Sequence, residues 1–198
     1  MRSLEFWYDF ASTYSYLSAM RIEIMAGQSG VAVQWKPFLL GPIFQAQGWT
    51  SSPFNIYPAK GRYMIRDMQR LSAERNLVFH SPTPFPQNSL LPARLTLALT
   101  AEDQRGAFTR AVYSGQFAHG LQLDDRTALG AVMDTLRLDS ARVFDISAGA
   151  AVKDALRHQT AQAQTFGIFG APTFRTADGE LFWGDDRLEQ ALAYATKA

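Results

Sequence analysis

Blocks of apolar and polar residues alternate along the chain, and each block predicts one kind of element. Residues 4–8 (LEFWY) and 31–35 (VAVQW) are short and apolar, with aromatic or β-branched residues that are typical of strands. Between them, apolar residues recur at helical spacing over residues 13–27, with a glycine at the end. The chain is therefore expected to open with two parallel strands joined by a right-handed helical crossover.

The middle of the chain is predicted to be mostly helical. Residues 39–59 are irregular and rich in glycine, proline and serine, which indicates a functional loop. Helices are expected at residues 60–76 and near residues 88–101, 103–118, 125–136 and 140–166. Their candidate N-caps are Asp124, Asp139 and Ser147.

The helix at residues 60–76 has two distinct faces. One face is apolar and is expected in the core, and the other carries arginines and is expected in solvent. The apolar residues are Tyr63, Met64, Met68 and Leu71, and the arginines are Arg62, Arg66 and Arg70.

The end of the chain returns to a strand pattern. Residues 172–175 and 181–183 are predicted to form two strands around the turn at residues 177–180 (ADGE). A terminal helix then starts at Asp185 and Asp186 and runs to about Thr196. The order βαβ, helical insertion, ββα is that of an α/β protein with a thioredoxin-like fold. We expect residues 1–40 and 167–198 to form its discontinuous thioredoxin-like domain, and residues 41–166 to carry the active-site loop and an all-helical insertion.

Composition narrows the chemistry. The chain has 198 residues, 47% of them hydrophobic, which suits one domain with an insertion. The net charge of +1 indicates neither nucleic acid nor an acidic membrane surface as a partner. The absence of cysteine excludes disulfide exchange and thiolate metal sites, and the three histidines lack ligand spacing, so no metal is expected. With no apolar run long enough for a membrane span, a cytoplasmic protein is expected.

The first candidate site lies where the first strand meets the first helix. The stretch from Ser12 to Ser15 (STYS) stands where a redox-active thioredoxin fold carries Cys-x-x-Cys. Ser12 has two readings there: a plain helix N-cap, or a hydrogen-bond donor to a thiolate that a ligand brings. No His–acid pair supports a serine nucleophile. Ser15 is expected to satisfy the first turn of the helix.

Two further stretches are candidates near the end of the chain. The Ala171–Pro172 bond is expected to be cis, which would leave the backbone of Ala171 free to pair with a peptide-like ligand. An ordinary proline at a strand start is the alternative. Asp185 and Asp186 start a helix, where an acid is a routine cap but can also bind a ligand ammonium group while the helix N–H groups bind its carboxylate.

Five stretches together resemble the 2-hydroxychromene-2-carboxylate isomerase family, whose close relatives are the kappa-class glutathione transferases of the DsbA-like thioredoxin-fold superfamily. The stretches span nearly the whole chain in the expected order. They are residues 9–17 (DFASTYSYL), 52–63 (SPFNIYPAKGRY), 85–89 (FPQNS), 167–173 (GIFGAPT) and 183–188 (WGDDRL). The family usually has proline and valine at the positions that Thr13 and Ala171 occupy here.

The resemblance implies an enzyme that uses glutathione to interconvert 2-hydroxychromene-2-carboxylate and trans-o-hydroxybenzylidenepyruvate, in aromatic catabolism. Ser12 would stabilise the glutathione thiolate, and the protein would be a homodimer. Implied glutathione contacts are Ser12, Thr13, Tyr14, Phe54, Asn55, Ala171, Pro172, Trp183, Gly184, Asp185 and Asp186. Implied substrate contacts are Trp49, Tyr57, Lys60 and Gln87.

Two other functions remain open at this stage. A kappa-like transferase would conjugate glutathione to electrophiles, and a thioredoxin-fold module without cysteine could bind peptides without any chemistry. Lys60 likewise has two readings, as the cation for a substrate carboxylate or as a solvated residue near a helix start, where a cation is unfavourable.

Overall fold

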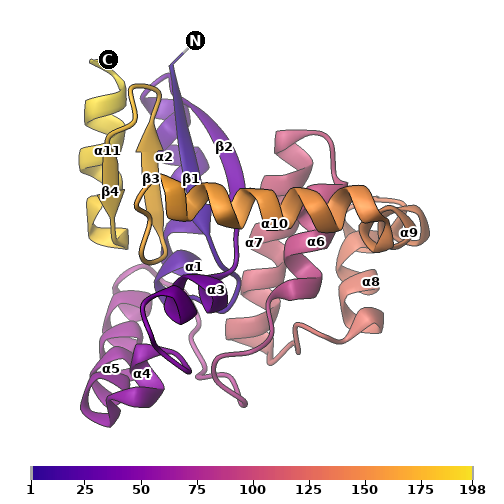
Figure 1. Ribbon diagram of the computed structural model, residues 1–198, viewed down its shortest axis with the longest axis horizontal. Coiled ribbons are helices and arrows are strands. Elements are labelled where there is room, and N and C mark those ends of the chain that lie inside the picture. Colours follow the sequence, from indigo (N-terminus) through magenta and orange to yellow (C-terminus); the bar gives the residue numbers. More distant parts are fainter. Residues whose placement is uncertain (1, 198) are drawn as a thin grey trace.

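The computed structural model describes residues 2–197, which form a mixed four-stranded sheet surrounded by helices (Figure 1). The strands are β1 (Ser3–Tyr8), β2 (Ala32–Pro37), β3 (Thr173–Thr176) and β4 (Leu181–Trp183). Their order in the sheet is β2-β1-β3-β4, with β1 parallel to β2 and antiparallel to β3. This is the expected thioredoxin arrangement, and it brings the two ends of the chain together in one sheet.

Strand β1 is buried on both of its faces. Successive side chains of a strand point to opposite faces, so β1 contributes to two apolar clusters. Leu4, Phe6 and Tyr8 pack into the larger apolar core, whereas Trp7 packs with Phe38 in a second cluster on the other face. The larger core contains both aliphatic and aromatic side chains, and the rings of Phe6 and Tyr8 stack 4.9 Å apart. A strand buried on both faces explains the almost continuous apolar run at the start of the sequence.

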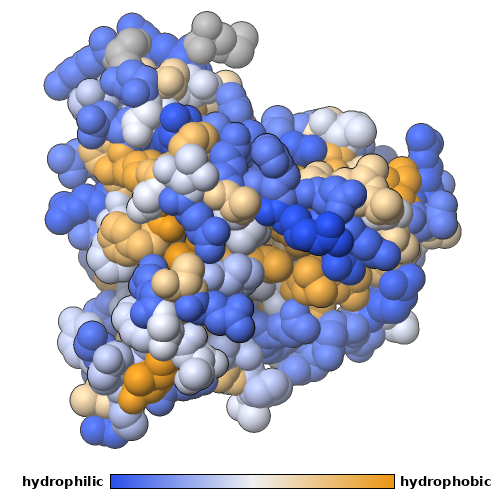
Figure 2. Space-filling model, viewed as in Figure 1, coloured by the Kyte–Doolittle hydropathy of each residue, from blue (hydrophilic) through white to orange (hydrophobic). Residues whose placement is uncertain are grey.

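The helices lie on both sides of the sheet and beyond its β2 edge (Figure 1). They are α1 (Thr13–Ala19), α2 (Ile22–Gln28), α3 (Leu40–Ala46), α4 (Pro53–Ile56), α5 (Pro58–Glu74), α6 (Leu90–Ala98), α7 (Glu102–His119), α8 (Arg126–Thr135), α9 (Ser140–Ala148), α10 (Ala150–Thr165) and α11 (Leu188–Ala195), with the short 3₁₀ helix η1 (Asp185–Arg187) before α11. In the space-filling view, polar residues cover most of the visible face, with apolar patches below α10 and beside β4 (Figure 2).

Several expected element boundaries are wrong. The predicted helix over residues 13–27 is two helices, because the chain breaks between Ala19 and Ile22. The predicted loop at residues 39–59 contains α3 and α4, and the helix at residues 140–166 is divided at Gly149, whose extended backbone ends α9.

The caps and one core residue also differ from expectation. Asp139 caps α9 as predicted, but Asp125 rather than Asp124 caps α8 by accepting from two backbone N–H groups. Ser147 caps no helix, since its hydroxyl donates to the carbonyl of Phe144. Tyr63 lies outside the core at 62% exposure, where the guanidinium of Arg70 covers its ring.

Candidate active site

A cleft of about 1380 Å³ opens at the carboxyl end of β1. Its walls come from three parts of the chain: residues 9–14 after β1, residues 39–90 from α3 to the start of α6, and residues 169–187 around β3 and β4. Single small-molecule sites usually measure roughly 300–1000 Å³. The cleft therefore has room for two small ligands side by side.

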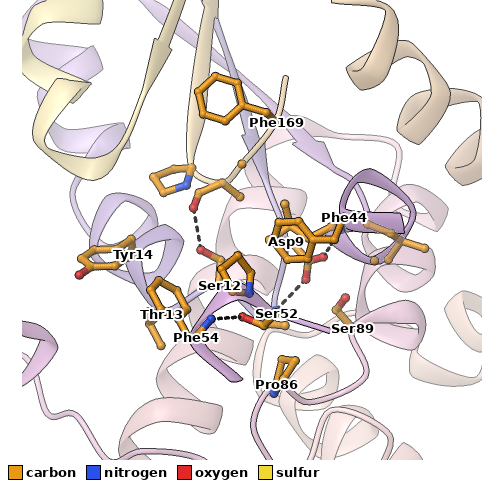
Figure 3. Close-up of a pocket in the computed structure, with 18 of the residues that line it drawn as sticks. Asp9, Ser12, Thr13, Tyr14, Phe44, Ser52, Phe54, Pro86, Ser89 and Phe169 are labelled. Carbon is orange, nitrogen blue, oxygen red and sulfur yellow. Dashed lines mark hydrogen bonds between the residues drawn. The ribbon is translucent and has the colours of Figure 1, made fainter. Parts of the chain in front are cut away.

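Ser12 lies at the floor of this cleft and is the N-cap of α1. Its hydroxyl oxygen accepts a hydrogen bond from the backbone N–H of Ser15 at 3.2 Å, and the hydroxyl donates a hydrogen bond to the carbonyl oxygen of Ala171 at 3.0 Å. Figure 3 shows the latter bond reaching up to the loop before β3. The two readings of Ser12 are thus compatible, because one oxygen caps the helix and also faces the cleft. The expectation for Ser15 is wrong: its hydroxyl has no partner among residues 2–197, and only its N–H is satisfied.

The loop before β3 forms the opposite wall. The Ala171–Pro172 peptide bond is cis, as expected from the sequence. Within the described residues, nothing accepts the N–H of Ala171, so this edge of the backbone is available to a ligand. A Cβ on Gly170 would stand 2.5 Å from the indole Nε1 of Trp183, so only glycine lets this loop approach the indole. The rings of Phe169 and Trp183, each about half exposed, pack 4.8 Å apart at the rim.

Asp185 and Asp186 have different surroundings although they are adjacent. Asp185 is 4% exposed, and its carboxylate binds Arg75 Nη2 at 2.7 Å, the hydroxyl of Ser18 at 2.8 Å and the guanidinium of Arg21. Asp186 is 75% exposed and lies 3.8 Å from Arg187 Nε. The Asp185 carboxylate is therefore part of the internal structure, and that of Asp186 is the acid available at the start of η1.

Asp9 is a buried acid of the cleft that sequence reasoning did not single out. Its carboxylate accepts the N–H of Ala11 at 2.8 Å and the N–H of Leu40 at 2.6 Å, which fixes the start of α3 beside the loop that carries Ser12 (Figure 3). Burial raises the pKa of Asp9, against the lowering effect of these N–H groups and of the Ser89 hydroxyl. The only sequence signal is an acid directly after an apolar strand.

The third wall is built by α4 and α5. Gly61 lies so close to α4 that a Cβ there would stand 2.3 Å from the carbonyl oxygen of Phe54. Phe54 and Lys60 line the cleft, and Lys60 Nζ lies 4.8 Å from the centre of the Tyr57 ring.

Asp67 on α5 also lines the cleft. Its carboxylate accepts a hydrogen bond from the phenol hydroxyl of Tyr14 at 2.9 Å. Burial together with this carboxylate raises the pKa of Tyr14.

Most of the residues implied by the resemblance meet in this one cleft, although they come from distant parts of the sequence. Asn55 and Tyr57 are not in its lining; the amide of Asn55 donates to the carbonyl of Phe85 at 3.0 Å. Gln87 lines it, but its amide is engaged by the backbone of Leu121 and Leu123. Those in the lining are Ser12, Thr13, Tyr14, Trp49, Phe54, Lys60, Gln87, Ala171, Pro172, Trp183, Gly184, Asp185 and Asp186.

Two other site types find no support within the described part of the chain. No group of three or more histidine or acidic residues between residues 2 and 197 is arranged to hold a metal ion. No helix in the same range is long and apolar enough to cross a membrane.

Comparison with known proteins shows which family the chain belongs to. The chain is 27% identical over 196 residues to a 2-hydroxychromene-2-carboxylate isomerase of Sphingobium xenophagum, covering 98% of this chain and 97% of that protein. It is 26% identical over 204 residues to glutathione S-transferase kappa 2 of Caenorhabditis elegans, covering 96% of this chain and 90% of that protein. A solved 2-hydroxychromene-2-carboxylate isomerase has the same fold, with a TM-score of 0.88 at 24% identity over 98% of this chain and 95% of that one. The profile of the DSBA-like thioredoxin domain matches residues 3–195, and the chain belongs to that family.

Proposed function

We propose that this protein is a glutathione-dependent isomerase of an aromatic, chromene-type carboxylate. The observation that carries the proposal is the placement of the Ser12 hydroxyl. It lies at the floor of a large cleft, in the position of the redox cysteine of a thioredoxin fold, in a chain that has no thiol of its own. Relatives of nearly the same length, which are named as isomerases and kappa glutathione transferases, support glutathione as the source of the thiol.

The polar groups of the cleft suit the parts of glutathione. The backbone of Ala171 has a free N–H and a carbonyl that can pair with the cysteine residue of the tripeptide. The exposed carboxylate of Asp186 suits the ammonium group of the γ-glutamyl residue. The sulfur would then lie at the start of α1, beside Ser12.

Ser12 would act as a hydrogen-bond donor and form no covalent bond. A free thiol has a pKa of about 8.5, so only a few per cent is ionised at neutral pH. A hydroxyl donor together with the N–H groups of the first helical turn can lower that pKa by about one to two units. When bound, glutathione would supply a thiolate nucleophile for reversible conjugate addition, and Ser12 with the N–H groups of the first turn of α1 would stabilise its negative charge.

The remainder of the cleft would receive the substrate. Trp49 and Phe54 provide apolar surface, and the ring of Trp49 packs 5.6 Å from that of Phe44. Lys60 offers a cation for the substrate carboxylate. Tyr57 contributes indirectly, because its ring lies under the Lys60 ammonium group.

Product analysis tests the proposal. The protein is incubated with glutathione and 2-hydroxychromene-2-carboxylate, and separately with glutathione and an aryl halide, beside a Ser12→Ala control. Conversion to the open-chain isomer with glutathione recovered, at a rate about tenfold higher than that of the control, is expected, because the loss of one hydroxyl donor should raise the pKa of the thiol by about one unit. A stable thioether from the aryl halide without isomerisation would instead identify a kappa-like transferase. Absence of glutathione binding would contradict both and leave a non-catalytic binding module.

A further inference from the structure

We propose that Thr13 supplies a second hydroxyl hydrogen bond to the thiolate of bound glutathione, and that this bond contributes as much to the acidity of the thiol as that of Ser12. The inference rests on the proposed function. It assigns a role in that function to a residue whose side chain is otherwise unexplained.

The hydroxyl of Ser12 is already engaged in the structure. A serine hydroxyl carries one proton and can donate one hydrogen bond at a time. The Ser12 hydroxyl donates that bond to the carbonyl oxygen of Ala171 at 3.0 Å, and the Ser12 oxygen also accepts a hydrogen bond from the N–H of Ser15. Ser12 can donate a hydrogen bond to a thiolate only when its hydroxyl gives up the hydrogen bond to the carbonyl of Ala171.

The hydroxyl of Thr13 is not engaged. Thr13 is the first residue of α1, next to Ser12, and it lines the cleft (Figure 3). The residue is 2% exposed, and its Oγ1 atom has no hydrogen-bond partner among residues 2–197. A buried hydroxyl without a hydrogen-bond partner is unfavourable, because it has lost its hydrogen bonds to water and gained none in return. An acceptor on a ligand would relieve that cost.

Location distinguishes Thr13 from the other buried polar groups without a partner. Among those in the described residues, only Thr13 and Arg75 line the cleft. Arg75 keeps its ion pair with Asp185 through another nitrogen of the same guanidinium. Those outside the cleft are Ser15, Ser72, Arg94, Arg110 and Gln116. Thr13 is therefore the uncommitted hydroxyl donor beside the expected position of the sulfur.

The test measures the pKa of bound glutathione by its thiolate absorbance, in the wild type and in Thr13→Val, Thr13→Ser and Ser12→Ala variants. Valine keeps the shape and branching of threonine and removes only the hydroxyl, whereas serine keeps the hydroxyl. We expect Thr13→Val to raise the pKa of the bound thiol by about one unit, Thr13→Ser to leave it near the wild-type value, and Ser12→Ala to raise it similarly. Affinity for S-methylglutathione, which has no thiolate, should be the same in wild type and Thr13→Val.

Two results would overturn the inference without touching the proposed function. One is an unchanged thiol pKa in Thr13→Val. The other is an equal loss of affinity for glutathione and S-methylglutathione, which would show that Thr13 only shapes the cleft. If Thr13→Val does not fold, Thr13→Ala replaces it with the same expected shift. A wild-type protein that binds glutathione with an unshifted thiol, or does not bind it, would overturn the proposed function itself.

Discussion

Arg75 Nη2 lies 2.7 Å from Asp185 Oδ2, and this ion pair joins the end of α5 to the start of η1 at the wall of the cleft. Arg21, just before α2, binds the same carboxylate at 3.3 Å and also pairs with Glu189 on α11. Two segments that are far from Asp185 in the sequence, the end of α5 and the residue just before α2, thus converge on one buried acid. The position of Asp186 at the mouth of the cleft depends on them.

We expect Asp185→Asn to destabilise the protein by about 3 kcal/mol, because the partly buried guanidinium of Arg75 loses its ion-pair partner and that of Arg21 loses one of its two. The free energy of unfolding from urea denaturation measures this loss. Asp186→Asn is the matched control, since that side chain is 75% exposed and its removal should change stability by less than about 0.5 kcal/mol. Equal effects of the two substitutions would contradict the assignment of Asp185 as structural.

The same pair of variants separates binding from stability. If Asp186 receives the ammonium group of glutathione, Asp186→Asn should weaken glutathione binding by about tenfold, because a charge-assisted bond becomes a neutral one. Isothermal titration calorimetry gives the dissociation constant. Glutathione that lacks its amino group should bind the wild type and Asp186→Asn with the same affinity; a persistent difference would place the ammonium elsewhere.

Gly61→Ala should displace α4 and disturb the wall that carries Phe54. The added Cβ would stand 2.3 Å from the backbone carbonyl oxygen of Phe54, and backbone atoms cannot move aside as a flexible side chain can. We expect a loss of about 1–3 kcal/mol in the free energy of unfolding and weaker ligand binding.

Gly41→Ala is the control for that substitution. Gly41 also lines the cleft and lies inside α3, but a Cβ there meets nothing within 4 Å. Alanine should therefore leave stability unchanged or raise it by up to about 1 kcal/mol. Thermal unfolding of both variants makes the comparison, and two similarly stable proteins would show that the contact between Gly61 and α4 is not tight.

Asp9 gives the protein a specific dependence of stability on pH. Burial raises its pKa above the ordinary value of 3.8, so the folded state binds this proton more tightly than the unfolded state does. The stability contributed by the protonated acid is complete below about pH 3.8 and is lost as the pH rises through the folded pKa.

Asp9→Asn removes this titration while the other acids stay in place. The difference in unfolding free energy between wild type and Asp9→Asn should therefore decrease as the pH rises from about 4 through the folded pKa of Asp9, by about 1.4 kcal/mol for each unit by which that pKa is raised. Urea denaturation at several pH values from 4 to 8 measures it. A difference that is constant across this range would show that the acid titrates normally.

The sequence predicted the sheet and the cis bond before β3 well, because both carry local patterns. The apolar strand, the stretch that starts at Ser12 and the proline before β3 each carry a short-range signal. Groups whose partners are distant in the sequence were missed. Asp9 is bound by Leu40, and Arg75 by Asp185, and neither residue carries a local pattern that reveals its partner.

The break in the first helix has the same cause. No glycine or proline marks Met20 and Arg21, and the apolar spacing continues past them. The side chain of Arg21 reaches Asp185 and Glu189, so long-range contacts hold the residue between the two helices. Tyr63 shows the opposite kind of error. Its spacing assigns it to the apolar face of its helix, but the structure leaves its side chain exposed to solvent.

The sheet order also has a consequence for synthesis on the ribosome. Ser12 and Ala171 are separated by 159 positions, and β1 pairs with β3 only after nearly the whole chain has been made. Until then, the edge of β1 that will bind β3 is unpaired, and an unpaired apolar edge invites association with other chains. A nascent chain, or one truncated before β3, therefore lacks the cleft and also exposes the strand on which the whole fold is built.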